Sequence, residues 1–388
     1  MNLPRPLSGL AKIATLCLVV AAACRPALPG EASPSPSQIA GELVPSEPMS
    51  VLVHIPGPGG ALYAPLLAIE GSDLLTNSGV SVYYSAPFPG EDPFLSSEDP
   101  TSLDLYLADA AAGLEARAQG ADLVAVAVYQ RSSDWMFIAP KKGAPASVAD
   151  LTGNILVQGY AGDGATVAAA ITAAGGDASA VTTEPFFDLM SPWDPTPLFD
   201  DTYPAALVPP WDGYIRATQG YSPITGKVIG KKGLATYEVR AQDAVQPTGL
   251  LLWAHAADLA IADKQIAGAL ALIGIAVGLA ECRDSATDCA GITLASGIAD
   301  QDEETLTWAI DQLNASIWPT SEGLFALSEP ALRAAADEAA AGGVEAGELA
   351  TWIDATLLDL ASLHWPEGLD LTGTSWQPLE LPLPTIAP

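Results

Sequence analysis

The sequence predicts an α/β fold built on mainly parallel sheets. Residues 50–129 read as strand, Gly-rich turn, helix, strand, helix and strand, an alternation typical of a parallel sheet. A second block over residues 136–238 again mixes short strands with helical segments, and the chain after Arg240 is mostly helical in pattern. Of the 388 residues, 49% are hydrophobic, so the chain can build the cores of two or three domains.

The first block starts with the β-type run Ser50–Ile55, followed by the turn Pro56-Gly57-Pro58-Gly59-Gly60. This turn opens a helix and places backbone N–H groups at its N-terminus, which suits a polar or anionic part of a ligand. The other expected elements of this block are strands over 79–84 and 122–129 and a helix over 103–119.

The second block contains a second turn of the same kind, Gly162-Asp163-Gly164-Ala165-Thr166, which opens a helix over 167–174. The strands expected in this block cover residues 137–140, 154–158 and 205–208. The helices expected in the last block cover residues 250–279, 303–317, 330–341 and 347–363.

The first 23 residues are typical of a signal peptide. Arg5 and Lys12 precede the apolar run Ile13–Ala23, which is shorter than the about 20 residues that a membrane-spanning helix needs. Three alanines directly before Cys24 resemble a bacterial lipobox, so we expect cleavage there and a lipid on Cys24 that anchors the exported chain to the membrane. The alternative is an ordinary secretory signal cleaved near Ala23, which exports the chain without an anchor.

Pro-rich segments flank the body. Residues 24–48 combine Cys24 with repeated Pro and Ser, a composition that predicts a semi-extended tether, and residues 369–388 form a similar Pro-rich tail. Of the four cysteines, Cys282 and Cys289 remain for the body. In an oxidising compartment their spacing favours a local disulfide, and the lack of a nearby His argues against a metal site.

The charge balance is strongly acidic, with 15 basic and 46 acidic residues and a net charge of −31. Such a surface repels nucleic acid and anionic membranes, so we expect no nucleic-acid partner and membrane contact only through the lipid. The acidity is uneven, because residues 136–239 hold six basic and ten acidic residues while the rest of the exported chain carries nearly all the remaining negative charge.

The sequence offers little for catalysis. The three histidines, His54, His255 and His364, form no metal-binding pair, and no G-x-S-x-G motif occurs. A Cys282–Cys289 disulfide would leave the body without a free thiol nucleophile. We therefore expect a protein that is not an enzyme and that needs no cofactor.

Several stretches resemble a known family. Residues 60–71 followed by Gly79-Val80-Ser81-Val82 resemble its opening motif, residues 120–127 and 147–153 resemble its next strand and turn, and residues 205–214 resemble its cleft edge. The family is that of ABC-transporter substrate-binding proteins, in the branch of nitrate, sulfonate and taurine binders and of thiamine-pyrimidine and riboflavin binders. The resemblance covers residues 50–360, and the chain departs from it in the acidic insert Glu91–Asp104.

The resemblance implies a type II periplasmic-binding-protein fold with a ligand cleft between two lobes. Lobe I would comprise residues 49–135 and 240–368, and lobe II residues 136–239. A monomer of this kind captures a small organic solute, such as an aromatic heterocycle of the thiamine-precursor or riboflavin type, and hands it to an ABC permease. The alternatives are a ligand-sensing surface lipoprotein and an enzyme like thiamine-pyrimidine synthase, whose Cys-rich motif this chain lacks.

Cleft rims lie at the carboxyl ends of parallel strands, which nominates polar and aromatic residues as ligand contacts. Packing is the alternative role for Tyr63 and Trp211, helix capping for Asp212, and a surface ion pair for Arg131. The nominated residues are Pro58, Gly59, Gly60, Tyr63, Gln130, Arg131, Ser132, Gly162, Asp163, Gly164, Thr166, Trp211, Asp212 and Tyr214.

Overall fold

The computed structural model describes the chain from residue 43 onward, with several gaps. The described residues are 43–55, 60–70, 72–85, 94–97, 99–132, 134–158, 163–186, 196–199, 202–239 and 249–384. They belong to one compact unit, which takes in Pro34–Pro388. The predicted signal peptide, the lipid-acceptor Cys24 and most of the predicted tether lie outside the described residues.

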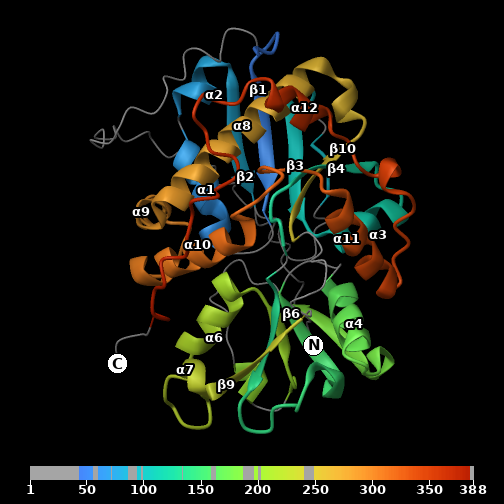
Figure 1. Cartoon of the computed structure of the whole chain (residues 1–388), viewed down its shortest axis with the longest axis vertical. Coiled ribbons are helices and arrows are strands. Elements are labelled where there is room, and N and C mark those ends of the chain that lie inside the picture. Colours follow the sequence, from blue (N-terminus) through green and yellow to red (C-terminus); the bar gives the residue numbers. More distant parts are fainter. Residues whose placement is uncertain are drawn as a thin grey trace, which may run out of the picture. The chain divides into compact units, whose positions relative to one another are not determined.

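Sheet A has five strands in the order β2-β1-β3-β10-β4. Its strands are β1 (Met49–His54), β2 (Val80–Ser85), β3 (Ser102–Ala108), β4 (Leu123–Val128) and β10 (Leu251–His255). β1 pairs in parallel with β2 and β3, whereas β10 runs antiparallel to β3 and β4. Sheet A and the helices packed on it form lobe I (Figure 1).

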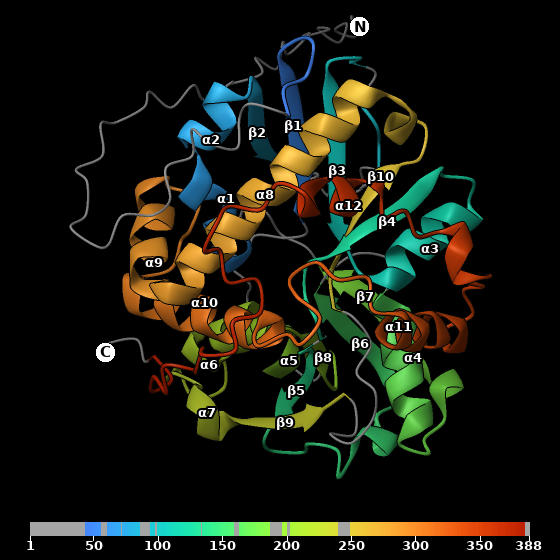
Figure 2. The ribbon, with the colours of Figure 1, turned by 45° about the horizontal axis from the view of Figure 1, so that its top comes forward.

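Helices cover both faces of sheet A. Leu103 and Leu105 share a core cluster with residues of α1 and α8 on one face, while Trp253 lies on the other face with residues of α3 and α11 (Figure 2). The longer helices of lobe I are α1 (Gly60–Ile69), α3 (Ala110–Ala118), α8 (Ala262–Asp284), α9 (Ala286–Ala295), α10 (Glu303–Ile317), α11 (Glu329–Ala341) and α12 (Thr356–Ser362).

α8 is the central helix of lobe I. It is the one described helix long and apolar enough to cross a bilayer, and 78% of its most apolar window is buried inside the fold. Gly278 permits its close approach to α1, because a Cβ there would collide with the Pro65 carbonyl. The apolar character of α8 is therefore used in the protein core.

Sheet B also has five strands, in the order β7-β6-β8-β5-β9. Its strands are β5 (Met136–Pro140), β6 (Gly153–Gln158), β7 (Val181–Phe186), β8 (Ala206–Val208) and β9 (Leu234–Glu238). The helices of this part are α4 (Asp163–Ala173), α5 (Thr196–Phe199), α6 (Ile215–Gln219) and α7 (Gly230–Gly233), with one π-helical turn, η4 (Pro210–Tyr214). Sheet B and these elements form lobe II.

The chain passes between the lobes twice, over residues 129–135 and again over 239–250. In each sheet four of the five strands share one direction, and the exceptions are β5 and β10, the strands that the chain enters from the other lobe. The predicted α/β architecture with two lobes and mainly parallel sheets is confirmed.

Three helix predictions were wrong in part. Residues 103–119 contain most of β3 before α3 begins, residues 250–279 begin with β10 before α8, and residues 347–363 are helical chiefly in α12. The run Ser102–Ala108 alternates Leu with Asp and Tyr, which is a strand pattern, and its strand is buried along its whole length. Pairing within the sheet outweighs the helix preference of Leu and Ala at these positions.

Asp104, the last residue of the predicted acidic insert, lies in β3 and is 1% exposed. Its carboxylate is 2.9 Å from Nε2 of His54 and accepts a 2.7 Å hydrogen bond from the backbone N–H of Ser97. The other ring nitrogen of His54 is 3.0 Å from the Ser85 hydroxyl. This buried chain of polar groups ties the end of the insert to sheet A.

The predicted disulfide is present. Cys282, near the end of α8, is bonded to Cys289 in α9, with Cα atoms 5.4 Å apart. Both residues are buried in the main core of lobe I. The bond fixes the sharp turn by which α9 folds back beside α8.

We expect the double variant C282S/C289S to lose about 2–3 kcal/mol of unfolding free energy, because the unfolded chain regains the freedom of the short loop. Urea unfolding of the oxidised protein and of the variant measures the difference. Reductant should destabilise the wild type by a similar amount and leave the variant unchanged, and equal stability of the two proteins would contradict the prediction.

Candidate functional site

The edge of lobe II that faces lobe I is formed where β8 ends. Pro209 and Pro210 stop the strand, and the chain continues through the π-helical turn η4 into α6. All five residues of η4 are buried, including Trp211, Asp212 and Tyr214, although they directly follow a strand end. A single π-helical turn of this kind is rare and often occurs at functional sites.

A cluster of three charges joins the lobes beside η4. Arg216 in α6 donates from Nε to Asp212 at 2.6 Å and from its two terminal nitrogens to Asp300 at 2.9 and 2.7 Å. Asp212 and Arg216 belong to lobe II, whereas Asp300 lies in the loop between α9 and α10 of lobe I. The pair with Asp300 is therefore a bidentate salt bridge between the lobes.

The titration behaviour of the cluster follows from these contacts. Burial opposes the charge of Arg216, but Asp212 and Asp300 outweigh that effect and raise its pKa. Hydrogen bonds from Arg216 lower the pKa of Asp300 against the opposing effect of burial. Arg216 and Asp300 are therefore both charged at neutral pH.

Other contacts also cross between the lobes. Gln219 in α6 donates a 2.7 Å hydrogen bond to the Thr305 hydroxyl in α10, and Figures 1 and 2 show these two helices next to each other. Farther along the boundary, Ala165 in α4 lies directly against Gly342, so that a Cβ at Gly342 would collide with it. The lobes thus meet at two separate places along their boundary.

Two buried polar atoms at the η4 edge have no hydrogen-bond partner among the described residues. They are the indole N–H of Trp211 and the side-chain oxygen of Gln158, at the carboxyl end of β6. The amide nitrogen of Gln158 donates to Asp212, which fixes the direction of the free oxygen. One donor and one acceptor near the lobe boundary are suited to a ligand that carries both kinds of group.

The nominated residues Gln130 and Ser132 of the first crossover contact Ser316 and Leu250 rather than the η4 edge. Gln130 is fully buried, donates to the Ser316 hydroxyl at 2.9 Å and accepts from the Leu250 backbone at 3.3 Å. The backbone N–H of Ser132 donates to the Ser316 carbonyl at 3.2 Å. A Cβ at Gly249 would collide with Gln130. Gln130 therefore packs against Gly249 and Leu250, the described residues at the end of the second crossover.

The remaining nominated residues lie at the ends of α1 and α4 or outside the described part. Tyr63 is buried in α1 with its ring edge-on to Tyr84, and burial raises the pKa of its hydroxyl. Gly60 and Asp163 are the first residues of α1 and α4, Gly164 lies against Thr183, and Thr166 is buried in α4. The nominated residues outside the described part are Pro58, Gly59 and Gly162.

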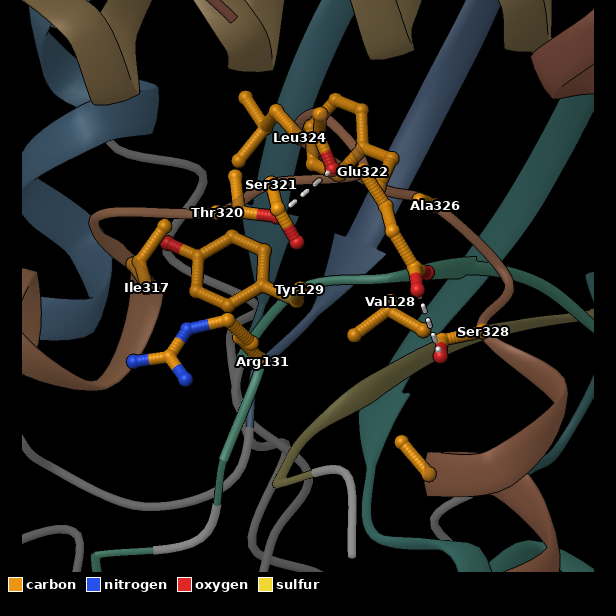
Figure 3. A pocket seen from close by; sticks show the side chains of 13 residues that line it. Val128, Tyr129, Arg131, Ile317, Thr320, Ser321, Glu322, Leu324, Ala326 and Ser328 are labelled. Atoms are coloured by element: carbon orange, nitrogen blue, oxygen red, sulfur yellow. Dashed lines mark hydrogen bonds between the residues drawn. The ribbon is translucent and has the colours of Figure 1, made fainter. Parts of the chain in front are cut away.

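Arg131 lies at a separate pocket of about 260 Å³. Figure 3 shows its guanidinium near the Tyr129 ring, with the loop between α10 and α11 forming the opposite wall. All lining residues come from lobe I or from the start of the first crossover. The structure therefore separates Arg131 from Trp211, Asp212 and Tyr214, which lie at the η4 edge.

Sequence reasoning missed Gln158, Arg216 and Asp300. Arg216 follows Asp212 by four residues, and this spacing is a visible signal for an ion pair on a helix. Asp300 comes from a distant loop, and nothing in the sequence connects it with Arg216.

Among the described residues, no cluster of His, Cys, Asp and Glu could hold a metal ion.

No family model matches this chain, and no curated protein matches it. Several solved structures are similar to this chain. One is the ligand-binding component of an ABC-type import system from Staphylococcus aureus, with zinc bound (TM-score 0.56, 11% identity, 81% of this chain and 99% of that one). Another is the alkanesulfonate-binding protein SsuA from Xanthomonas axonopodis pv. citri bound to MOPS (TM-score 0.51, 16% identity, 81% and 98%).

A third similar structure is a Candida albicans gene product described as having the generic periplasmic binding protein structural fold (TM-score 0.50, 11% identity, 85% and 98% of the two chains). The chain has the periplasmic-binding-protein fold. Its similar structures include sulfonate-binding proteins of the kind that the sequence resembles. In a periplasmic-binding-protein fold the lobe boundary is the place to look for a ligand, and here that boundary contains the η4 edge.

We expect Asp300→Asn to lower the unfolding free energy by about 1 kcal/mol at pH 7, because the salt bridge between the lobes is lost while one side of it stays partly solvated. The folded-state pKa of Asp300 is depressed, so its contribution is present above the unfolded value of about 4 and is lost as the pH falls through the folded value. Urea unfolding at several pH values between 3 and 7 measures this.

Asp284→Asn is the matched control, since Asp284 is 69% exposed and pairs with Arg283 within lobe I. The control should change stability little at any of these pH values. If Asp300→Asn also left stability unchanged at pH 7, the cluster would not hold the lobes together.

Proposed function

We propose that this chain is the extracytoplasmic solute-binding component of an ABC import system. It captures a small organic solute between its lobes and delivers it to a membrane permease. The fold supports a binding role, and structures similar to this one are described as an ABC import component and as a sulfonate-binding protein. The observation that carries the proposal is the η4 edge, where a donor and an acceptor without a partner among the described residues lie at a boundary bridged by the Arg216–Asp300 salt bridge.

The mechanism is closure of the lobes on the solute. The indole N–H of Trp211 and the oxygen of Gln158 hold complementary groups of the solute. Binding on lobe II orders the η4 turn, and the same turn carries Asp212, which positions Arg216 for Asp300. Solute binding thereby favours the closed arrangement, which the permease recognises.

The described charges favour a neutral or cationic solute. Arg216 is the basic residue at this edge, and two aspartates neutralise it. A sulfonate or nitrate would need a free cation or several N–H donors there. An aromatic heterocycle with a donor and an acceptor, such as a thiamine precursor or riboflavin, would satisfy Trp211 and Gln158 and could stack on an aromatic ring.

A thermal-shift screen against thiamine precursors, riboflavin, taurine, alkanesulfonates and nitrate, followed by titration calorimetry, identifies the solute. We expect Trp211→Phe to weaken its binding about fivefold, because the substitution keeps the ring and removes one hydrogen-bond donor worth about 1 kcal/mol.

Trp352→Phe is the control, since Trp352 is fully buried against Trp253 in lobe I and its N–H also has no partner among the described residues. This variant should bind like the wild type. Equal affinity of the wild type, Trp211→Phe and Trp352→Phe would show that Trp211 does not contact the solute.

Turnover of the ligand would support an enzyme, and unimpaired uptake in cells lacking the gene would support a sensor.

We further propose that residues 1–23 are removed and that Cys24 carries a lipid that holds the protein outside the membrane. Cys24→Ser should abolish incorporation of labelled palmitate and release the exported protein from the membrane fraction, because the acyl chains supply the membrane affinity. A Cys17→Ser control should behave like the wild type. Export of an unlabelled, soluble wild type would indicate an ordinary signal peptide instead.

A further inference from the structure

The pocket beside Arg131 has features that the proposed transport function does not use. It lies at the start of the first crossover and is closed on the other side by residues 320–328, which lead from α10 to α11. Val128 and Phe325 pair there as an isolated antiparallel bridge, so β4 holds this wall in place. No described residue of lobe II lines the pocket, which distinguishes it from a site between the lobes.

Arg131 brings a positive charge to this pocket, and the residue is exposed to solvent. Within the part of the chain that the structure describes, its side chain makes no hydrogen bond or ion pair. Desolvation by the surrounding walls lowers the pKa of its guanidinium, with no acidic neighbour opposing the effect. In a protein with a net charge of −31, an unpaired arginine at a pocket is conspicuous, and an anionic ligand group would compensate it.

Tyr129 adds a second, independent indication. Its side chain is 3% exposed, lines the same pocket, and its hydroxyl has no partner among the described residues. A buried hydroxyl without a partner loses its hydrogen bonds to water and gains none from the protein. In Figure 3 this hydroxyl and the Arg131 guanidinium both point toward the Ile317 side of the pocket.

The opposite side of the pocket is acidic. Glu322 is the one acidic residue among its described lining residues, and its carboxylate accepts a 3.3 Å hydrogen bond from the Ser328 hydroxyl. Figure 3 shows this carboxylate on the Ser328 side, away from the guanidinium. Leu324 and Phe325 add apolar side chains to the lining of the pocket.

We propose that this pocket is a second binding site, which takes a small zwitterion with an anionic and a cationic group joined by a short apolar chain. The anionic group bonds to Arg131 and to the Tyr129 hydroxyl, and the cationic group pairs with Glu322. The volume of about 260 Å³ lies below the roughly 300–1,000 Å³ typical of sites for drug-sized molecules, which restricts the ligand to amino-acid size.

The position of the pocket gives its ligand a regulatory role. Tyr129 and Arg131 flank Gln130, which packs against Gly249 and Leu250 and is bonded to Ser316. A ligand that holds both neighbours restrains the segment that must bend when the lobes open. Occupancy of the pocket therefore alters the affinity for the transported solute.

Calorimetric titration of the full exported chain with ω-amino acids, from glycine to 5-aminovalerate, tests the site. We expect saturable binding with an optimum at one chain length, and binding at least about tenfold weaker for the matched probes propionate and propylamine, which each retain one charge. Arg131→Gln and Glu322→Gln should each weaken binding about tenfold or more. Tyr129→Phe should weaken it about fivefold without lowering the melting temperature.

The controls are Arg333→Gln and Glu345→Gln, which make the same changes at exposed positions of lobe I that do not line the pocket. They should bind the amino acid normally. The proposal is overturned if no member of the series binds saturably or if Arg131→Gln binds as well as the wild type. Binding lost in Trp211→Phe but kept in Arg131→Gln would place the amino acid between the lobes and also overturn it.

Discussion

The buried guanidinium of Arg216 is the interaction on which the arrangement of the two lobes depends. Removing the guanidinium charge from water costs free energy. This cost is offset when carboxylates of both lobes accept hydrogen bonds from the guanidinium. Asp212 provides one of these from the same helical turn, whereas Asp300 provides two from the other lobe. The local pair can exist in either lobe arrangement, but the bidentate pair exists only where the lobes meet.

This division of roles suits a protein that must open and close. Asp300 is 47% exposed, so water can replace the lost hydrogen bonds when the lobes part. An ion pair with a partly exposed member adds only about 1 kcal/mol to the free energy of unfolding. The two parallel hydrogen bonds between Arg216 and Asp300 nevertheless require one relative position of the two lobes. In the proposed function, the free energy that decides between open and closed forms comes from a solute at the proposed site of Trp211 and Gln158, next to Asp212 on the same edge. Closure is favoured by the ligand without being fixed in its absence.

The local parts of this design could be predicted from the sequence, and the non-local parts could not. The strand ends and Gly-rich turns nominated Trp211, Asp212 and Tyr214 together, because they are neighbours in the chain. Arg216 could have been added from its spacing to Asp212. Asp300 is 84 residues from Arg216, and only the packing of α10 against η4 brings them together.

The same limit explains the prediction for Gln130. A residue that follows a strand in this fold can lie either at the cleft rim or in a crossover, and the two positions look alike in sequence. Gln130 is buried against Gly249 and Leu250, next to Arg131, which lines a pocket of lobe I. Likewise, β3 and β10 were assigned to helices because their Leu and Ala content hides pairing that only the folded sheet supplies.

The first crossover connects the two proposed sites physically. Gln130 and Ser132 are bonded to Ser316 at the end of α10, and the N-terminal end of α10 is preceded by Asp300. One rigid helix thus joins the segment beside the Arg131 pocket to the salt bridge that holds the lobes together. If a ligand in the pocket shifts the equilibrium between open and closed forms, the transported solute must shift the affinity of the pocket by the same factor.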